Sequence, residues 1–188
     1  MQFYANPSNK KWAVLYATWC GSTRDAAAWI SEGMNRIADV FDVREKPNLK
    51  DYDYIVIGSA IRSWQSHPEL QAYIKENKDW LKNKVRGLFA VCGNYGRAVD
   101  QQQTTQFIDN HLVKLCEVSN VPSRVFNGRI TKSLWEPELV TELKKQAQPL
   151  PDDPEKKPRP TLLDMPDYDK LSRWYCMDFG KLVFEKTK

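Results

Sequence analysis

The chain has few of the residues that build disulfide frameworks or zinc sites. Its four cysteines, Cys20, Cys92, Cys116 and Cys176, are scattered, with neither a C-x-x-C pair nor the spacing of metal ligands. Histidine is scarcer still, at two residues, so no structural metal is expected. Reduced thiols in a reducing compartment are typical of such cysteine use.

Long apolar runs are also missing. No run approaches the roughly 20 residues that cross a bilayer, and residues 1–11 lack the charged-then-apolar pattern of a signal peptide. The chain has 188 residues, of which 41% are hydrophobic and 28% charged, and this length suits one domain with one core. We therefore expect a single cytoplasmic domain over residues 1–188.

Strong charge of one sign and the common nucleotide motifs are missing as well. The net charge of +4 is too weak to indicate a nucleic-acid partner, and no nucleic-acid-binding motif is present. The glycine-lysine-serine motif of nucleoside triphosphatases does not occur, and neither does G-x-G-x-x-G. These observations favour a site of a different kind.

Short apolar runs, typical of strands buried on both faces, alternate with segments of helical periodicity. The strand candidates are residues 12–17, 40–43, 54–58, 87–92 and 123–128. Helical spacing of apolar residues marks the segments 26–37, 68–83 and 107–115 between them. This alternation predicts βαβ crossovers and a parallel sheet, and therefore an α/β fold, but periodicity does not define the strand order.

One segment, residues 131–166, breaks the alternation as an insertion before the last helix. It contains a helical stretch at 137–147 and then five prolines within 149–160, a density that prevents a regular helix or a central strand. It is either a surface linker or an ordered lid, and a surface excursion is favoured. A helix over 168–186 then closes the sheet, with Trp174 and Tyr175 expected in the core.

The loop after the first strand candidate carries the clearest chemical pattern. Ligands of open parallel sheets bind at the carboxyl ends of the strands, where Thr18–Thr23 precedes a helix N-terminus. The free N–H groups there favour a phosphate, Gly21 permits close approach, and three hydroxyls can donate hydrogen bonds. No cation precedes Arg24, which suits a monophosphate. The same residues could also form an ordinary helix N-cap.

Two motifs resemble a known family. The stretch Tyr16–Thr23 resembles the T-x-T-G-x-T phosphate loop of flavodoxins, with Cys20 where a threonine is usual. The stretch Asp53–Arg62, with His67 and a helix behind it, is similar to the third strand and following loop of flavodoxin-like, menaquinone-dependent protoporphyrinogen oxidases. The resemblance implies a three-layer, doubly wound, five-stranded parallel sheet of order 2-1-3-4-5 that binds one FMN.

The resemblance also implies the cofactor-binding residues. The phosphate loop would comprise Thr18, Trp19, Cys20, Gly21, Ser22 and Thr23. Two further loops would clasp the flavin ring, with Ser59, Ala60, Ile61, Arg62 and Trp64 in one and Cys92, Gly93, Asn94, Tyr95 and Gly96 in the other. Trp64 and Tyr95 either stack on the ring or pack as ordinary side chains. No catalytic residue is assigned, and His67 is expected to be a cap or a structural contact.

Three functions remain open. The first is an FMN oxidoreductase of the protoporphyrinogen-oxidase type, with a small organic substrate and a quinone acceptor. The second is an electron carrier between redox proteins, and the third is an interaction module without cofactor. Carrier flavodoxins are typically acidic, so the basic charge counts against the second. Any membrane contact would be peripheral, through the basic last helix.

Overall fold

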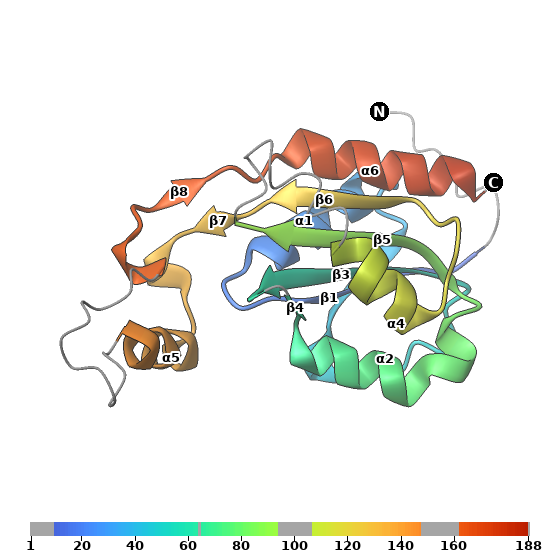
Figure 1. The fold of residues 1–188 in the computed structure, drawn as a ribbon. Coiled ribbons are helices and arrows are strands. Elements are labelled where there is room, and N and C mark those ends of the chain that lie inside the picture. The colour runs from blue at the N-terminus through green and yellow to red at the C-terminus, as the bar shows by residue number, and fades with distance from the viewer. Residues whose placement is uncertain (1–9, 64, 94–106, 148–161, 188) are drawn as a thin grey trace.

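The computed structural model describes residues 10–63, 65–93, 107–147 and 162–187, which form a sheet covered by helices on both faces (Figure 1). The strands pair in the order β2-β1-β3-β5-β6, all parallel, and β4 pairs antiparallel with the end of β3. These strands are β1 Trp12–Ala17, β2 Ala38–Asp42, β3 Tyr54–Arg62, β4 Gln65–Ser66, β5 Val85–Cys92 and β6 Ser123–Asn127. The predicted order of the five parallel strands is confirmed, whereas the short β4 was not predicted.

The helices form the two outer layers. Helices α1 (Ser22–Gly33) and α6 (Arg173–Lys186) pack together on one face of the sheet. The other face is covered by α2 (Pro68–Leu81) and by a π-helix, Ile108–Val113, that continues into α4 (Lys114–Cys116). None of the helices in the described ranges is long and apolar enough to span a membrane.

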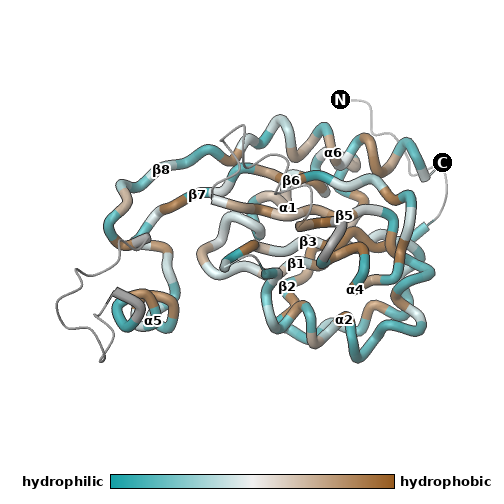
Figure 2. Tube along the Cα trace, viewed as in Figure 1, coloured by the Kyte–Doolittle hydropathy of each residue, from teal (hydrophilic) through white to brown (hydrophobic). Residues whose placement is uncertain are grey.

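Strand β1 shows why the central strands are continuous apolar runs. Ala13 and Leu15 face the layer of α2 and α4, whereas Val14 and Tyr16 face α1 and α6. All six residues of the strand are buried, so both faces must be apolar. Figure 2 shows the same pattern, with hydrophobic residues along the strands and a mixture of hydrophobic and hydrophilic residues on the helices.

The last helix differs from the sequence expectation. It begins at Arg173, where the Oγ of Ser172 accepts a hydrogen bond from Tyr175 N, and residues 168–169 form strand β8 instead. The prediction that Trp174 and Tyr175 lie in the core is wrong, since they are 67% and 57% exposed. A Cβ at Gly180 would overlap the carbonyl oxygen of Ile30, so this glycine fixes the buried face. That face carries Cys176, Phe179 and Val183.

Candidate functional site

The strand ends converge on one edge of the sheet, on the side of the molecule where β7 (Arg129–Ile130), α5 (Pro137–Ala147) and β8 (Tyr168–Asp169) lie (Figure 1). The loop from Thr18 to Gly21 joins β1 to α1 at this edge. Gly21 N donates to Thr18 Oγ1 at 3.0 Å, which closes the loop on itself. Gly21 is the N-cap of α1 and has φ +82°, a left-handed conformation that glycine adopts without strain.

The first turn of α1 carries two buried hydroxyls. Ser22 is 4% exposed and Thr23 is fully buried, yet neither Oγ of Ser22 nor Oγ1 of Thr23 has a hydrogen-bond partner among the described residues. The N-cap Gly21 has no side chain to cap the helix, and the first N–H groups, as in any helix, have no intrahelical acceptor. Buried polar groups are normally paired, and this cluster of donors therefore fits an anion such as a phosphate.

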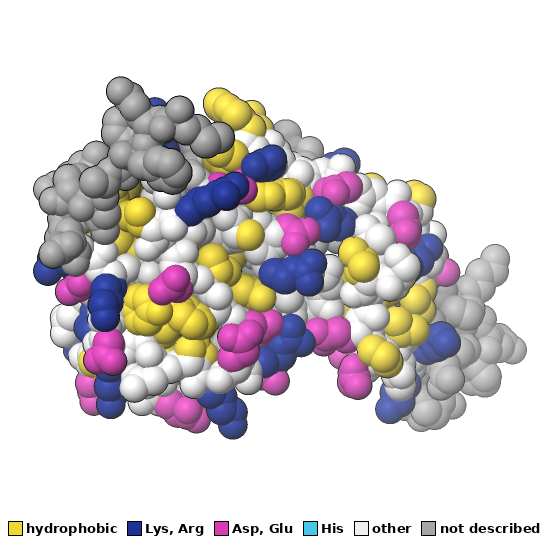
Figure 3. All heavy atoms as spheres, turned by 180° about the vertical axis from the view of Figure 1, so that it is seen from behind, with side chains coloured by type: hydrophobic (Ala, Val, Ile, Leu, Met, Phe, Trp, Pro, Cys, Tyr) yellow, Lys and Arg dark blue, Asp and Glu magenta, His cyan; other side chains and the backbone are white. Residues whose placement is uncertain are grey.

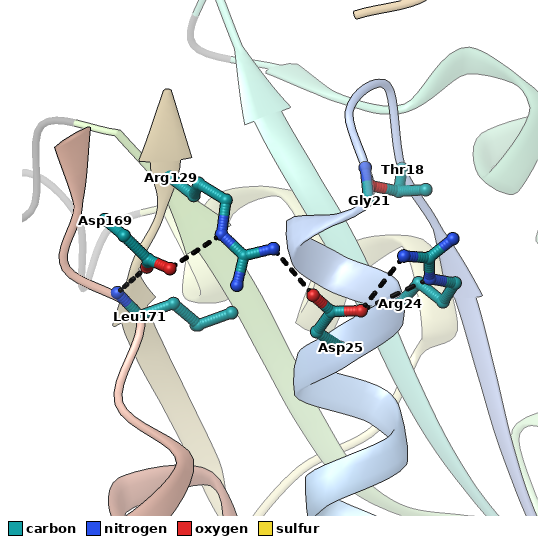
Figure 4. A network of polar contacts seen from close by, with 7 residues as sticks. All are labelled: Thr18, Gly21, Arg24, Asp25, Arg129, Asp169 and Leu171. Carbon is teal, nitrogen blue, oxygen red and sulfur yellow. Dashed lines mark hydrogen bonds and ion pairs between the residues drawn. The ribbon is translucent and has the colours of Figure 1, made fainter. Parts of the chain in front are cut away.

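Asp25 would oppose such an anion if its charge were free, because it lies in the first turn of α1. Figure 4 shows that both of its carboxylate oxygens are paired. Oδ1 accepts two hydrogen bonds of 3.2 Å from Arg24, and Oδ2 accepts one of 2.7 Å from Arg129. The positive end of the helix is thus left available to a ligand.

The loop after β3 is a hairpin. Strand β3 continues through Ile61 and Arg62, and β4 returns beside it, with Ser63 turning the chain at φ +47°. The hydroxyl of Ser59 already makes hydrogen bonds within the hairpin: it accepts one from His67 N at 2.9 Å and donates one to Ala60 O at 2.8 Å. Trp64 lies outside the described residues, so its expected stacking stays a prediction.

Trp19 of the first loop packs against this hairpin. Its ring centroid lies 4.4 Å from that of His67, and the Arg62 guanidinium lies 5.7 Å from it on the hairpin. His67 is the N-cap residue of α2, but its side chain makes no capping hydrogen bond, and its buried Nδ1 has no partner in the described structure. Burial lowers the pKa of His67, so the ring is neutral near pH 7.

The loop after β5 is described as far as Gly93. Both carbonyl groups at its start are taken by later parts of the chain: Gly128 N donates to Cys92 O at 3.0 Å, and the Tyr168 hydroxyl donates to Gly93 O at 2.5 Å. Burial raises the pKa of Tyr168, so the hydroxyl keeps its proton. The predicted residues Asn94, Tyr95 and Gly96 lie outside the described structure.

The insertion forms a structure that we call the cap, defined as residues 129–147 and 162–169. Strands β7 and β8 pair antiparallel at its base, and Ile130, Trp135, Leu139 and Leu143 form a small apolar core of its own. Trp19 and Cys20 of the first loop pack against this core. The helix expected at 137–147 is thus present as α5, whereas the proline-rich residues 149–160, expected to be a surface linker or an ordered lid, lie outside the described residues.

Ion pairs join the cap to the loops beneath it. Arg44, just after β2, makes hydrogen bonds of 3.0 and 2.6 Å to Asp42 and one of 2.6 Å to Glu136 of the cap. Nη2 of Arg62 lies 2.8 Å from Oε1 of Glu142, although the angle between them is unsuited to a hydrogen bond. Arg129 connects Asp25 on α1 to Asp169 on β8 at 2.7 and 2.9 Å (Figure 4).

The structure brings the described loop residues to the same edge of the sheet. Their direct contacts place Trp19 beside Arg62 and His67, and Cys20 beside the cap. Four residues that contact these loops or join them to the cap were not expected from the sequence: Arg44, Glu136, Glu142 and Tyr168. No local pattern marks them, because their partners are distant in the sequence. Arg44 and Glu136 are 92 residues apart, and Tyr168 and Gly93 are 75 residues apart.

Comparison with known proteins gave one family match and several relatives. A family model described as a flavodoxin domain matches residues 13–139. The protoporphyrinogen IX dehydrogenase [quinone] of Escherichia coli strain K12 is 29% identical over 86 residues, which cover 43% of this chain and 48% of that protein. The chain thus spans about half the length of the curated relatives that it matches.

Solved structures share the fold at low identity. A flavodoxin from the domain Archaea superposes with a TM-score of 0.50 at 13% identity, covering 93% of this chain and 96% of that chain. The two-electron reduced flavodoxin of Megasphaera elsdenii gives a TM-score of 0.50 at 15% identity, covering 93% and 98%. These similarities show the architecture.

Proposed function

This chain belongs to the flavodoxin domain family, its cofactor is accordingly FMN, and we propose that it is an oxidoreductase that passes electrons from a small reduced organic substrate to a quinone. The finer assignment is similar to the activity named for the E. coli relative, protoporphyrinogen IX dehydrogenase [quinone]. When bound, FMN would supply reversible two-electron chemistry. The protein's part is to bind and orient the cofactor and to control access to it.

The observation that carries the proposal is the pair of unpartnered hydroxyls at the start of α1. The phosphate would accept hydrogen bonds from Ser22 Oγ, Thr23 Oγ1 and the first N–H groups of the helix. Gly21, without a side chain, leaves space for the phosphate, and the hydrogen bond from Gly21 N to Thr18 Oγ1 fixes the shape of the loop. The donors match a single phosphate, because no lysine or arginine lies in the loop before Arg24.

The hairpin and the loop after β5 would hold the flavin ring. On this proposal, Ser59, Ala60, Ile61, Arg62 and Trp64 line one side, and Cys92, Gly93, Asn94, Tyr95 and Gly96 line the other. The ordered backbone of the hairpin, held by the hydrogen bond from His67 N to Ser59 Oγ, would present fixed polar groups to the ring. Such fixed groups are the usual means by which a protein sets the reduction potential of a flavin.

Two features favour an enzyme over a carrier between proteins. The chain is basic, with a net charge of +4, whereas an acidic surface steers carrier flavodoxins to their partners. The cap also adds to the carboxyl edge an ordered structure that a minimal electron carrier does not need.

Reconstitution followed by stopped-flow kinetics tests the proposal. The protein should bind about one FMN per chain, and a terminal monophosphate should be preferred over FAD. After chemical reduction, a menaquinone analogue should reoxidise the holoprotein faster than a cytochrome or a ferredoxin does. Failure to bind FMN would support an interaction module, whereas rapid exchange with proteins and indifference to quinone would leave an electron carrier.

A further inference from the structure

The cap reaches the loop that follows each of the first four parallel strands. It packs on Trp19 after β1, pairs with Arg44 after β2 and Arg62 at the end of β3, and bonds to Gly93 after β5. It is covalently continuous with β6 through Gly128. The cap therefore contacts the described part of every one of these loops, at the edge where the proposed function places the flavin.

This coverage affects large and small redox partners differently. A specific protein–protein contact buries about 800 Å² on each partner, and weak redox encounters somewhat less. A protein acceptor would need a patch of about that size around the exposed flavin, on the loops where the cap lies. A small planar acceptor needs only a pocket of about 300–1,000 Å³, far less room than a docked protein.

Charge at this edge is also unsuited to steering a protein partner. The arginines that the edge presents are already paired with carboxylates: Arg44 with Asp42 and Glu136, Arg62 with Glu142, and Arg129 with Asp25 and Asp169. The face seen in Figure 3 likewise shows cationic and anionic side chains interspersed over the described residues. A surface that attracts a charged protein needs one sign gathered around the site.

We propose that the cap selects the electron acceptor, admitting small quinone-like molecules to the cofactor and excluding redox proteins. This inference rests on the proposed function. In the permitted reaction, the quinone takes two electrons and two protons from the reduced cofactor and leaves as the quinol, and the cofactor is returned to its oxidised form. A one-electron protein acceptor cannot dock close to the cofactor while the ion pairs of Glu136 and Glu142 keep the cap on the loops.

A double variant, Glu136→Gln with Glu142→Gln, tests the proposal in the FMN-loaded protein. It removes the two ion pairs that join the cap to Arg44 and Arg62, from Glu136 just before α5 and from Glu142 within it, and neither glutamate is part of the proposed cofactor site. The matched control is Glu138→Gln with Glu76→Gln. It makes the same change in charge at two exposed residues for which the described structure shows no ion pair.

Cap release is measured first, by hydrogen exchange of the α5 amides. Partly exposed ion pairs shift an equilibrium by about two- to fivefold each, so exchange in the double variant should be about tenfold faster than in the control. The holoproteins are then reduced and mixed with a menaquinone analogue, with cytochrome c and with a ferredoxin at about 0.15 M salt. Cytochrome c is basic and the ferredoxin is acidic, so a change that appears with both cannot be due to the net charge of the acceptor.

The reaction with both proteins should accelerate about tenfold in the double variant, while the quinone rate stays within about twofold of the control. Faster α5 exchange without faster protein reactions would overturn the proposal, as would α5 exchange that does not change. Loss of FMN binding or of quinone reactivity in the unmodified protein would instead contradict the proposed function.

Discussion

Replacement of Thr23 by valine should have opposite effects on the apoprotein and on cofactor binding. Valine has nearly the same shape, and the Thr23 hydroxyl it removes is fully buried and has no hydrogen-bond partner among the described residues. Without FMN, the apoprotein should therefore be unchanged or stabilised by up to about 1 kcal/mol. With FMN, the phosphate loses a buried donor, which should weaken binding by about 1–3 kcal/mol, or about 5- to 150-fold in Kd.

Both effects can be measured on the same preparations. Urea unfolding of the apoprotein gives the stability, and quenching of flavin fluorescence gives the Kd for FMN. Thr187→Val is the control, because this hydroxyl donates to Val183 O within α6, far along the chain from the site. An unchanged Kd for Thr23→Val would refute the phosphate site, and an apoprotein weakened by more than about 1 kcal/mol would show that the hydroxyl is already paired.

Three further predictions concern the frame of the site. Gly21→Val should weaken FMN binding more than Thr23→Val and destabilise the apoprotein by about 1–3 kcal/mol, since a β-branched residue is strained at φ +82°; titration and urea unfolding measure both. The pKa of His67 is lowered in the folded protein, so the unfolded state takes up the proton first as the pH falls below 6.5, and the free energy of unfolding decreases there. Urea unfolding at pH 7.5 and at pH 5.5 should show this decrease, and His67→Gln should reduce it. Gly180→Ala should cost about 1–3 kcal/mol by thermal unfolding, because its methyl group would push α6 away from Ile30; an unchanged melting temperature would contradict this close contact.

Local patterns were sufficient to predict the regular elements. The strand Trp12–Ala17 and the helix Pro137–Ala147 have the bounds that the sequence suggested, because each is a short segment of clear periodicity. The start of α6 and its buried face could not be derived in this way. Ser172, the N-cap residue of α6, comes soon after the two-residue strand β8. The close contact of Gly180 with α1, rather than apolar spacing alone, decides which side of the helix is buried.

The candidate site was predictable only in part. The loop before α1 is contiguous in sequence, so its glycine and hydroxyls could be recognised together. The hairpin of β4 was not expected, since Ser63 adopts positive φ and the residues around it are polar. Side chains that the cap contributes, such as Glu136 before α5 and Glu142 within it, come from a distant segment and resemble the ordinary glutamates of a surface helix and its flank.

The position of Cys20 connects the phosphate loop to the cap. A threonine is usual at this place in flavodoxin loops, but here the cysteine packs against the apolar core of the cap, together with Trp19. Burial raises the pKa of the Cys20 thiol, so it stays protonated where it packs against the cap. The loop and the helix start thus have two roles: Ser22 and Thr23 carry buried hydroxyls without a hydrogen-bond partner among the described residues, whereas Trp19 and Cys20 pack against the cap. Because one short loop serves both tasks, binding of a phosphate and docking of the cap would support each other.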